Sequence, residues 1–276
     1  MTVVPATVRG RTAPVARLGG EPRVVRWAKG TVGVLVAIGL WELVRALSLL
    51  PQDYVPSVPT ILRATVENLD NGLLAATGET LKAWGFGMLI TIGIGVAFGI
   101  AIGLSRWADA ASRVVVEFLR PVPSVALIPV AVLIFGIGLR MQLLLIVFAC
   151  VWPVLFNVRY GVQSVDRLLI DTARVSGLTR RDVVRRVVFP AALPATFTGI
   201  RIASSIALVL AVSSEMVSGS PGLGKLIVDA DAAANVELSY AGVFVTGVVG
   251  LLLNLGLQIA DRRLLPWSLA ARSDLA

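Results

Sequence analysis

Long apolar stretches, most of them without a charged residue, follow one another along the chain. A helix needs about 20 apolar residues to cross a hydrocarbon core about 30 Å thick. Stretches of about that length cover residues 31–50, 83–105, 121–139, 141–158, 197–218 and 238–260. The pattern predicts an all-α integral membrane protein, with six transmembrane helices in one domain of residues 30–267.

Basic residues gather in alternate segments between these spans. They are frequent in 1–29, 106–120 and 159–196 and near the C-terminus, whereas the other connections carry little positive charge. Because segments rich in Lys and Arg stay on the cytoplasmic side, we expect both termini to be cytoplasmic. We expect 1–29 to be a disordered basic tail and 268–276 a short tail, with the basic segments against anionic membrane lipid.

Composition supports the membrane assignment and excludes several classes of protein. Hydrophobic residues make up 56% of the chain and charged residues 15%, against about 25% charged in soluble domains. The chain has no histidine and one cysteine, Cys150. Histidine catalysis, histidine metal sites and an internal disulfide are therefore excluded. The net charge of +8 is explained by the basic loops, and we expect no nucleic-acid partner.

The long polar segment 159–196 is too long for a simple turn. Its pattern predicts one short helix over about 165–176, a break at Gly177, and a second helix capped by Thr179. We expect Pro190 and Pro194 to end the second helix before the next span. Valines form a stripe along that helix, beside four arginines. An amphipathic helix of this kind rests either on anionic lipid or on a partner protein.

The spacing within this segment carries a resemblance. Asp171-Thr172-Ala173 is followed by three residues, Gly177, nine residues, and Val-Val-Phe-Pro ending at Pro190. This resembles the EAA loop of ABC importer permeases: Glu-Ala-Ala, three residues, Gly, nine residues, Ile, any residue, Leu, Pro. Ala173, Gly177 and Pro190 match, and Asp171 stands in place of Glu. The shorter side chain puts the contact made by that carboxylate in doubt.

Other motifs extend the resemblance over about residues 55–267. They include the Pro-Ser-x-Pro segment at 56–59, Pro-Val-Pro at 121–123, Phe-Gly-Ile-Gly at 135–138, Gly-Ile-Arg at 199–201, Ser-Glu-Met at 214–216 and Gly-Leu-Gly at 222–224. The set resembles the nitrate, sulfonate, taurine and bicarbonate branch, which also includes permeases for thiamine-precursor and riboflavin-like ligands. It implies a MetI-like ABC permease fold in the bacterial cytoplasmic membrane, with 159–196 as cytoplasmic coupling loop.

The resemblance also implies partners and a mechanism. Two permease chains, by default a homodimer, pair with two cytoplasmic ABC ATPase subunits, and an extracytoplasmic binding protein delivers the solute. ATP and Mg²⁺ are then held by the ATPase, so this chain binds no cofactor or metal and is no enzyme. The resemblance places the ATPase contact at Asp171, Thr172, Ala173, Gly177, Leu178, Thr179, Arg180, Arg181, Asp182 and Pro190.

A glycine-rich stretch, residues 219–225, matches the first seven positions of a Walker A loop. The eighth position is Leu226, where Ser or Thr should hold magnesium, and the stretch follows a span instead of a buried strand. We therefore expect no ATP site here.

Charges within the spans are few. A carboxylate inside a membrane usually faces protein or water, so Glu215, with Ser213 and Ser214, is a candidate pathway or gate residue. The equally weighted alternative is a structural partner for a group near Gly219. Glu42 and Arg45 are expected to form a local ion pair. Small residues at Gly95, Gly99 and Gly103 predict close helix packing.

Two other classes of function remain as alternatives. A stand-alone secondary transporter or channel is disfavoured because no inverted repeat is evident and buried ionisable residues are few. A membrane enzyme is disfavoured because no paired carboxylates, Ser/His pair or metal-ligand set lies at a membrane face. The sequence does not name the solute: a sulfonate, nitrate, taurine or related ligand is implied, with a heterocycle as the alternative.

Overall fold

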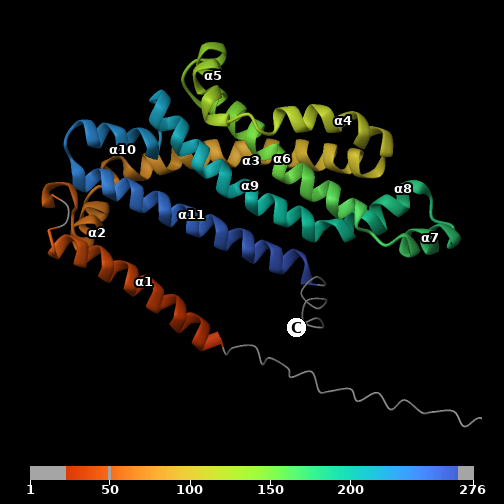
Figure 1. The fold of residues 1–276 in the computed structure, drawn as a ribbon, viewed down its shortest axis with the longest axis horizontal. Helices are drawn as coiled ribbons and strands as arrows, with labels where there is room; N and C mark the ends of the chain where they lie inside the picture. Colours follow the sequence, from red (N-terminus) through yellow and green to blue (C-terminus); the bar gives the residue numbers. More distant parts are fainter. Residues whose placement is uncertain (1–22, 49–50, 267–276) are drawn as a thin grey trace, which may run out of the picture.

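The computed structural model describes residues 23–48 and 51–266, and these residues form helices joined by short turns (Figure 1). In chain order the elements are α1 (Arg23–Ala46), η1 (Gln52–Tyr54), α2 (Val58–Glu67), η2 (Leu69–Leu73), α3 (Leu74–Leu104), α4 (Arg106–Leu119), η3 (Ser124–Leu127), α5 (Ile128–Phe135), α6 (Leu139–Gln163), α7 (Arg167–Val175), α8 (Arg180–Val183), η4 (Val184–Val188), α9 (Phe189–Ser218), α10 (Leu223–Ala232) and α11 (Val236–Leu264).

Helices α3, α6 and α9 form the core of the bundle and run side by side in Figure 1. The glycine stripe of α3 faces α6. A Cβ atom on Gly95 would lie 2.7 Å from Val154, and one on Gly99 would lie 2.7 Å from Val158. At Gly103 the corresponding distance to Val162 is 2.8 Å. The predicted close packing is therefore confirmed, since only glycine lets these backbones approach so closely.

Within the described residues, four helices are long and apolar enough to cross a membrane: Leu69–Leu104, Leu139–Gln163, Arg180–Ser218 and Val236–Leu264. They contain the predicted spans 83–105 (up to Leu104), 141–158, 197–218 and 238–260. The segments Arg106–Leu119 and Ser124–Phe135 would make a fifth span if taken together, but they are bent by 76°. The described residues thus give four or five spans, and the predicted total of six stays a prediction.

The predicted continuous span 121–139 is not one helix. Pro121 and Pro123 lie in the turn after α4, η3 follows, and α5 ends before Gly136 at φ +71° and Gly138 at φ +137°. Proline removes backbone donors and positive φ ends a helix, so an uncharged apolar run is broken at both ends.

The N-terminal helix also differs from the expectation. Residues 1–22 of the predicted tail lie outside the described residues, as does the tail 268–276, but α1 begins at Arg23 and ends at Ala46. No Pro and no Gly occurs in 23–29, so nothing in the sequence prevents the helix from starting there. The predicted Glu42–Arg45 ion pair is confirmed at 3.6 Å.

Helix α2 lies between the first two predicted spans and was not predicted. Ser57 caps it by accepting a hydrogen bond from the Thr60 N–H, and Pro59 occupies its first turn. Glu42 of α1 accepts the Val58 N–H at 2.8 Å. The Pro-Ser-x-Pro motif is thus a helix start, which is a role that Ser before Pro commonly plays.

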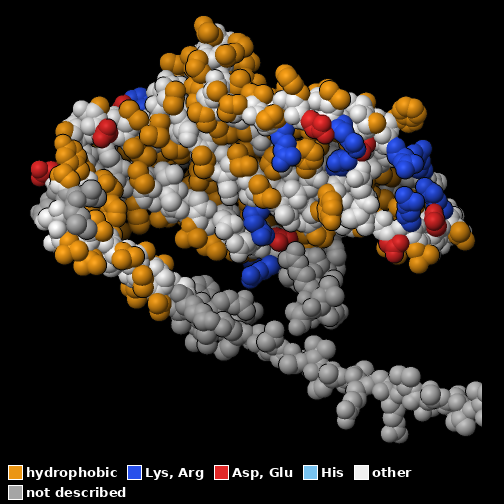
Figure 2. All heavy atoms as spheres, viewed as in Figure 1, with side chains coloured by type: hydrophobic (Ala, Val, Ile, Leu, Met, Phe, Trp, Pro, Cys, Tyr) orange, Lys and Arg blue, Asp and Glu red, His pale blue; other side chains and the backbone are white. Residues whose placement is uncertain are grey.

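Charge is unevenly distributed over the surface. In Figure 2, Lys and Arg gather mainly toward the end of the bundle formed by α4, α7 and α8, whereas the middle of this face is largely hydrophobic or uncharged. The exposed apolar side chains include Leu133 at 85% and Leu89 at 69%. A surface of this kind fits a bilayer environment for the long helices.

Candidate functional site

The predicted coupling segment forms two short helices joined by a tight turn, here called the α7–α8 segment (residues 167–183). Asp166 caps α7 by accepting the Leu168 N–H at 2.9 Å. Gly177 has φ +82°, and the next N–H, of Leu178, returns to the Ala173 carbonyl at 3.1 Å. A glycine in this conformation ends helices because other residues are strained there. The break predicted at Gly177 is therefore present.

Thr179 begins the second helix as predicted. Its hydroxyl oxygen accepts the Asp182 N–H at 3.3 Å, and the same hydroxyl donates to Asp182 Oδ2 at 2.5 Å. The hydrogen bond from Thr179, together with the positive charge of Arg186, lowers the pKa of the Asp182 carboxyl. Asp182 therefore stays ionised, which also suits the positive end of a helix.

The predicted end of that helix at Pro190 and Pro194 is wrong. The chain continues without a break from Arg180 to Ser218. Between α8 and α9 the element η4 is a π-helical turn, in which the Phe189 N–H donates to the Val184 carbonyl. The wider turn places Pro190 in the first turn of α9, where a missing N–H costs least. At 39 residues the helix is about 58 Å long, so it extends well beyond the hydrocarbon core.

The two faces of the α7–α8 segment differ. Val183 and Val188 are buried against the bundle, and Ile170, Ala173 and Leu178 pack against the same core. The valine stripe of the second helix thus rests on this chain's own helices. On the outer face, Leu168, Leu169 and Val175 are 70%, 55% and 89% exposed. Apolar side chains so exposed on a charged helix mark a surface suited to a partner.

The predicted contact residues lie mainly on that outer face. Asp171, Thr172, Gly177, Thr179, Arg180 and Arg181 are exposed, whereas Ala173, Leu178, Asp182 and Pro190 are partly buried. The carboxylate of Asp171 lies 3.6 Å from Arg174 one turn away and is 67% exposed. The Asp171 carboxylate is therefore accessible to a group of another protein. Pro190, in contrast, lies in the first turn of α9 and helps to support the segment.

Glu215 lies at the centre of a buried network at the other end of α9. Its side chain is fully buried. Thr80 of α3 donates to Oε2 at 3.0 Å, the Gly224 N–H of α10 donates to Oε2 at 2.9 Å, and Gln142 Nε2 of α6 lies 3.4 Å from Oε1. Thr80 also accepts the Leu223 N–H at 2.9 Å. One carboxylate therefore joins α3, α6, α9 and α10.

The glycine-rich loop 219–224 wraps around this carboxylate. Gly219 ends α9 in the left-handed conformation, and a Cβ atom on Gly222 would lie 2.2 Å from Glu215 Cδ. Lys225 pairs with Asp229 on the same helix. The backbone N–H groups of this loop are thus used inside the chain: Gly224 donates to Glu215, Leu223 to Thr80 and Ser220 to Ser218. No strand precedes the loop in the part of the chain that is described.

The two serines beside Glu215 are less prominent. Ser214 is fully buried and donates to the Ala211 carbonyl at 2.8 Å, one turn earlier. Ser213 is half-buried. Thr80 and Gln142, which complete the network, were not found from sequence: they lie 135 and 73 residues from Glu215, and neither belongs to a recognisable motif.

Comparison with known proteins gives the family of this chain. The family model described as "binding-protein-dependent transport system inner membrane component" matches residues 73–267. The chain belongs to this permease family. The resemblance to ABC importer permeases read from residues 55–267 is therefore confirmed.

Several relatives resemble this permease over most of its length. A putative aliphatic sulfonates transport permease protein, SsuC of Bacillus subtilis, is 30% identical over 87% of this chain and 88% of its own. The taurine transport system permease protein TauC of Escherichia coli is 31% identical, covering 89% and 90%. The nitrate import permease protein NrtB of Leptolyngbya laminosa is 29% identical, covering 94% and 95%.

Solved structures support the fold. A chain of the MetNI methionine ABC transporter in an inward-facing conformation has a TM-score of 0.61 at 20% identity, over 72% of this permease and 97% of that chain. A chain of an amino acid ABC transporter has a TM-score of 0.54 at 18% identity, over 72% and 96%. The permease is thus a multi-pass inner-membrane subunit of a binding-protein-dependent importer, with the predicted MetI-like fold. No cluster of three or more possible metal ligands occurs among its described residues.

Proposed function

We propose that this permease uses the α7–α8 segment to couple ATP hydrolysis on separate ATPase subunits to alternating access. The observation that carries the proposal is the outer face of α7, where exposed leucines and Val175 adjoin the exposed Asp171 and Thr172. The inner face of the segment packs on the core that contains α3, α6 and α9. A force applied to the outer face is therefore passed to long packed helices, which move as rigid bodies.

The assembly that follows contains two copies of this chain, two ABC ATPase subunits and an extracytoplasmic solute-binding protein. ATP and Mg²⁺ bind to the ATPase, and this chain holds no cofactor and catalyses no reaction. The α7–α8 segment, both termini and the other basic segments face the cytoplasm, since arginines are concentrated there. Anionic lipid surrounds these segments.

We expect Glu215 and its network to act as part of the outer gate. The loop that it holds follows α9 directly, and α9 begins as the continuation of α8. A movement of the α7–α8 segment along this helix would reach the loop without an intervening flexible joint. Ser213 and Ser214 lie on the same turn and would move with it.

The coupling proposal is tested by co-purification from native membranes. A tagged full-length chain is solubilised gently, and the proteins that accompany it are identified by mass spectrometry. Asp171→Arg reverses the charge on the outer face of α7, and Gly177→Pro removes the turn. Asp70→Arg is the matched control, because Asp70 is also exposed but lies in η2.

We expect an ABC ATPase to accompany the native chain and the Asp70→Arg variant. The yield of the ATPase should fall about tenfold or more with Asp171→Arg, since placing like charges next to each other at a contact costs several kcal/mol. Both coupling variants should remain monodisperse. An unchanged ATPase yield with Gly177→Pro would contradict the proposal.

The solute is proposed to be a small sulfonate, taurine, nitrate or a related organic ligand. Relatives whose names state aliphatic sulfonates, taurine and nitrate align with 87–94% of this chain. The test is uptake of labelled taurine, an alkanesulfonate and nitrate by cells with and without this chain, with a thiamine precursor as the heterocycle. Loss of uptake of one of the anions is expected; loss of heterocycle uptake alone would select the alternative.

A further inference from the structure

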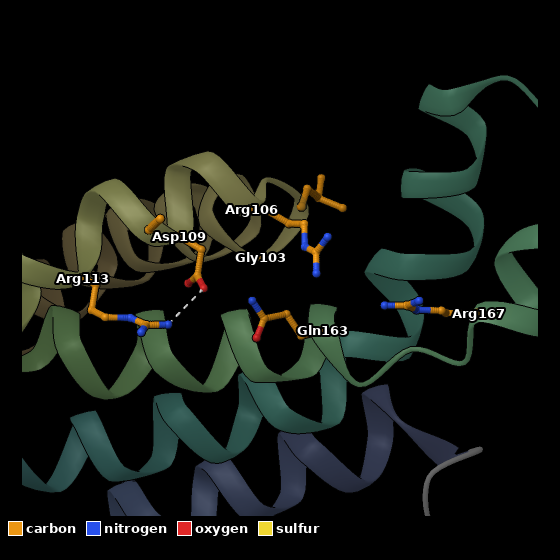
Figure 3. A pocket seen from close by; sticks show the side chains of 8 residues that line it. Gly103, Arg106, Asp109, Arg113, Gln163 and Arg167 are labelled. Carbon is orange, nitrogen blue, oxygen red and sulfur yellow. Dashed lines mark ion pairs between the residues drawn. The ribbon is translucent and has the colours of Figure 1, made fainter.

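A polar pocket of about 600 Å³ lies where α3 and α6 end and where α4 and α7 begin. Figure 3 shows the residues that line it and labels Gly103, Arg106, Asp109, Arg113, Gln163 and Arg167. The guanidinium groups of Arg106 and Arg167 come from different helices and extend toward the same open space, beside Gln163.

Positive charge around the pocket exceeds negative charge. Asp109 is held by Arg159, with 2.5 Å from Oδ1 to Nε and 3.0 Å from Oδ2 to NH2, and lies 3.9 Å from Arg113. Among the described residues, no carboxylate lies within 4 Å of Arg106 or Arg167. Three arginines and one aspartate therefore line the pocket, and Arg159 pairs with that aspartate from the adjoining hollow, so positive charge is in excess.

The remaining acidic groups nearby have other roles. Asp166 precedes Arg167, but its carboxylate caps α7. Glu117 lines the adjoining hollow along α4, together with Arg120. Neither of these carboxylates forms an ion pair within 4 Å of Arg106 or Arg167, so the two guanidinium groups are not paired by a neighbouring helix among the described residues.

The position of the pocket relates it to the membrane surface. Leu104 is the last residue of α3 and Gln163 the last of α6, and both helices are long and apolar enough to span. Trp107, beside the pocket, is 88% exposed. Spans end at the level of the phospholipid head groups, which is also where tryptophan is enriched.

We propose that this pocket binds a phosphate-type oxyanion. Guanidinium groups offer paired donors that match phosphate oxygens, and the Gln163 amide can donate as well. Helix α4 begins at the pocket with Ser105 as its cap, so its N-terminus adds partial positive charge. Because Arg167 is the first residue of α7, a bound anion ties the start of α7 to the start of α4.

Two sources supply such an anion: the head group of an anionic phospholipid at this depth, or free phosphate. In the lipid arm, the full-length chain in neutral detergent is titrated with phosphatidylglycerol or phosphatidylcholine, and bound lipids are counted by native mass spectrometry. In the ion arm, the thermal midpoint is measured in sodium phosphate and in sodium chloride of equal ionic strength.

Two variants remove the site by different means. Arg106→Gln combined with Arg167→Gln removes the unpaired guanidinium groups, and Ala110→Glu places a carboxylate at the exposed lining residue Ala110. The control combines Arg63→Gln with Arg140→Gln. It removes the same charge from exposed positions on α2 and at the start of α6.

We expect phosphatidylglycerol, phosphate or both to bind the native chain, and the arm that responds identifies the source. Both site variants should weaken that binding about tenfold or more, while the control changes it less than about twofold. Absence of binding in both arms, or equal weakening in the control, would overturn the proposal.

Discussion

At the scale of single residues, the carboxylate of Glu215 is held by Thr80, Gln142 and the Gly224 N–H, which come from three other helices. The position of Glu215 near the end of a span marked it as a candidate from sequence. The sequence did not identify the residues that hydrogen-bond to it. Hydrogen bonds between residues far apart in sequence leave no local signature. The alternative considered from the sequence was that Glu215 is a structural partner for a group near Gly219. The hydrogen bond that Glu215 accepts from the Gly224 N–H is a contact of that kind.

Replacement of Glu215 by alanine is expected to destabilise the bundle. It leaves the buried Gly224 N–H without its acceptor, at a cost of about 1–3 kcal/mol, and it leaves the Thr80 hydroxyl with only the Ala76 carbonyl at 3.3 Å. The single cysteine reports the change, since Cys150 is fully buried in the α3–α6–α9 core. Thiol labelling of Cys150 should therefore become about tenfold faster or more.

The control for this prediction is Glu79→Ala. Glu79 is one residue from Thr80, but its side chain is 45% exposed and pairs with Lys82 at 2.6 Å. An exposed pair contributes little, so labelling should change less than about threefold. Equal labelling of the Glu215 and Glu79 variants would show that the buried network contributes nothing to stability.

At the scale of elements, apolar runs predicted the long helices well. The stripe of Gly95, Gly99 and Gly103 also gave the packed face of α3, because small residues four apart line one side of a helix. The amphipathic helices α2 and α4 were missed, since hydropathy over a whole span does not detect a short helix that carries charges. Ser57 and Ser105, each of which caps its helix, were the available signals.

Gly99→Ala tests the seam between α3 and α6. The added methyl would lie 2.7 Å from Val158 Cβ and 3.0 Å from the Leu155 carbonyl oxygen. Such overpacking costs about 1–3 kcal/mol, so the thermal midpoint of the purified chain should fall.

Gly93→Ala is the matched control on the same helix. Nothing lies within 4 Å of a Cβ at Gly93, and alanine favours a helix by about 0.5–1 kcal/mol over glycine. Its midpoint should stay equal or rise. A Gly99 variant as stable as the Gly93 variant would contradict the close approach of α3 and α6.

The helix that runs from α8 into α9 shows a limit of sequence reasoning at this scale. Proline usually ends a helix, but the π-helical turn at η4 shifts the hydrogen bonds, and Pro190 is accommodated in the first turn of α9. As a result, α8 continues into the core helix α9 without a break, which is what the proposed coupling requires. The prolines and glycines around 121–139 did break an apolar run, because there they occur at both of its ends.

At the scale of the whole molecule, the family was predictable from spaced motifs, since the α7–α8 segment and the other matches cover most of the chain. The identity of the solute was not predictable, and the homodimer stays a prediction, because both depend on surfaces shared with other chains. The proposed coupling depends on one contact: the outer face of α7 receives an ATPase subunit.

The most direct test places a cross-linker on that face. Thr172→Cys introduces an exposed thiol on α7, and the native Cys150 is buried and need not be removed. A photoactivatable thiol reagent attached there in native membranes captures whatever lies against it. Ala75→Cys, exposed near the start of α3, is the control. We expect an ABC ATPase to be cross-linked from residue 172 and none from residue 75. Capture of lipid alone from residue 172, or equal capture of the ATPase from both positions, would contradict it.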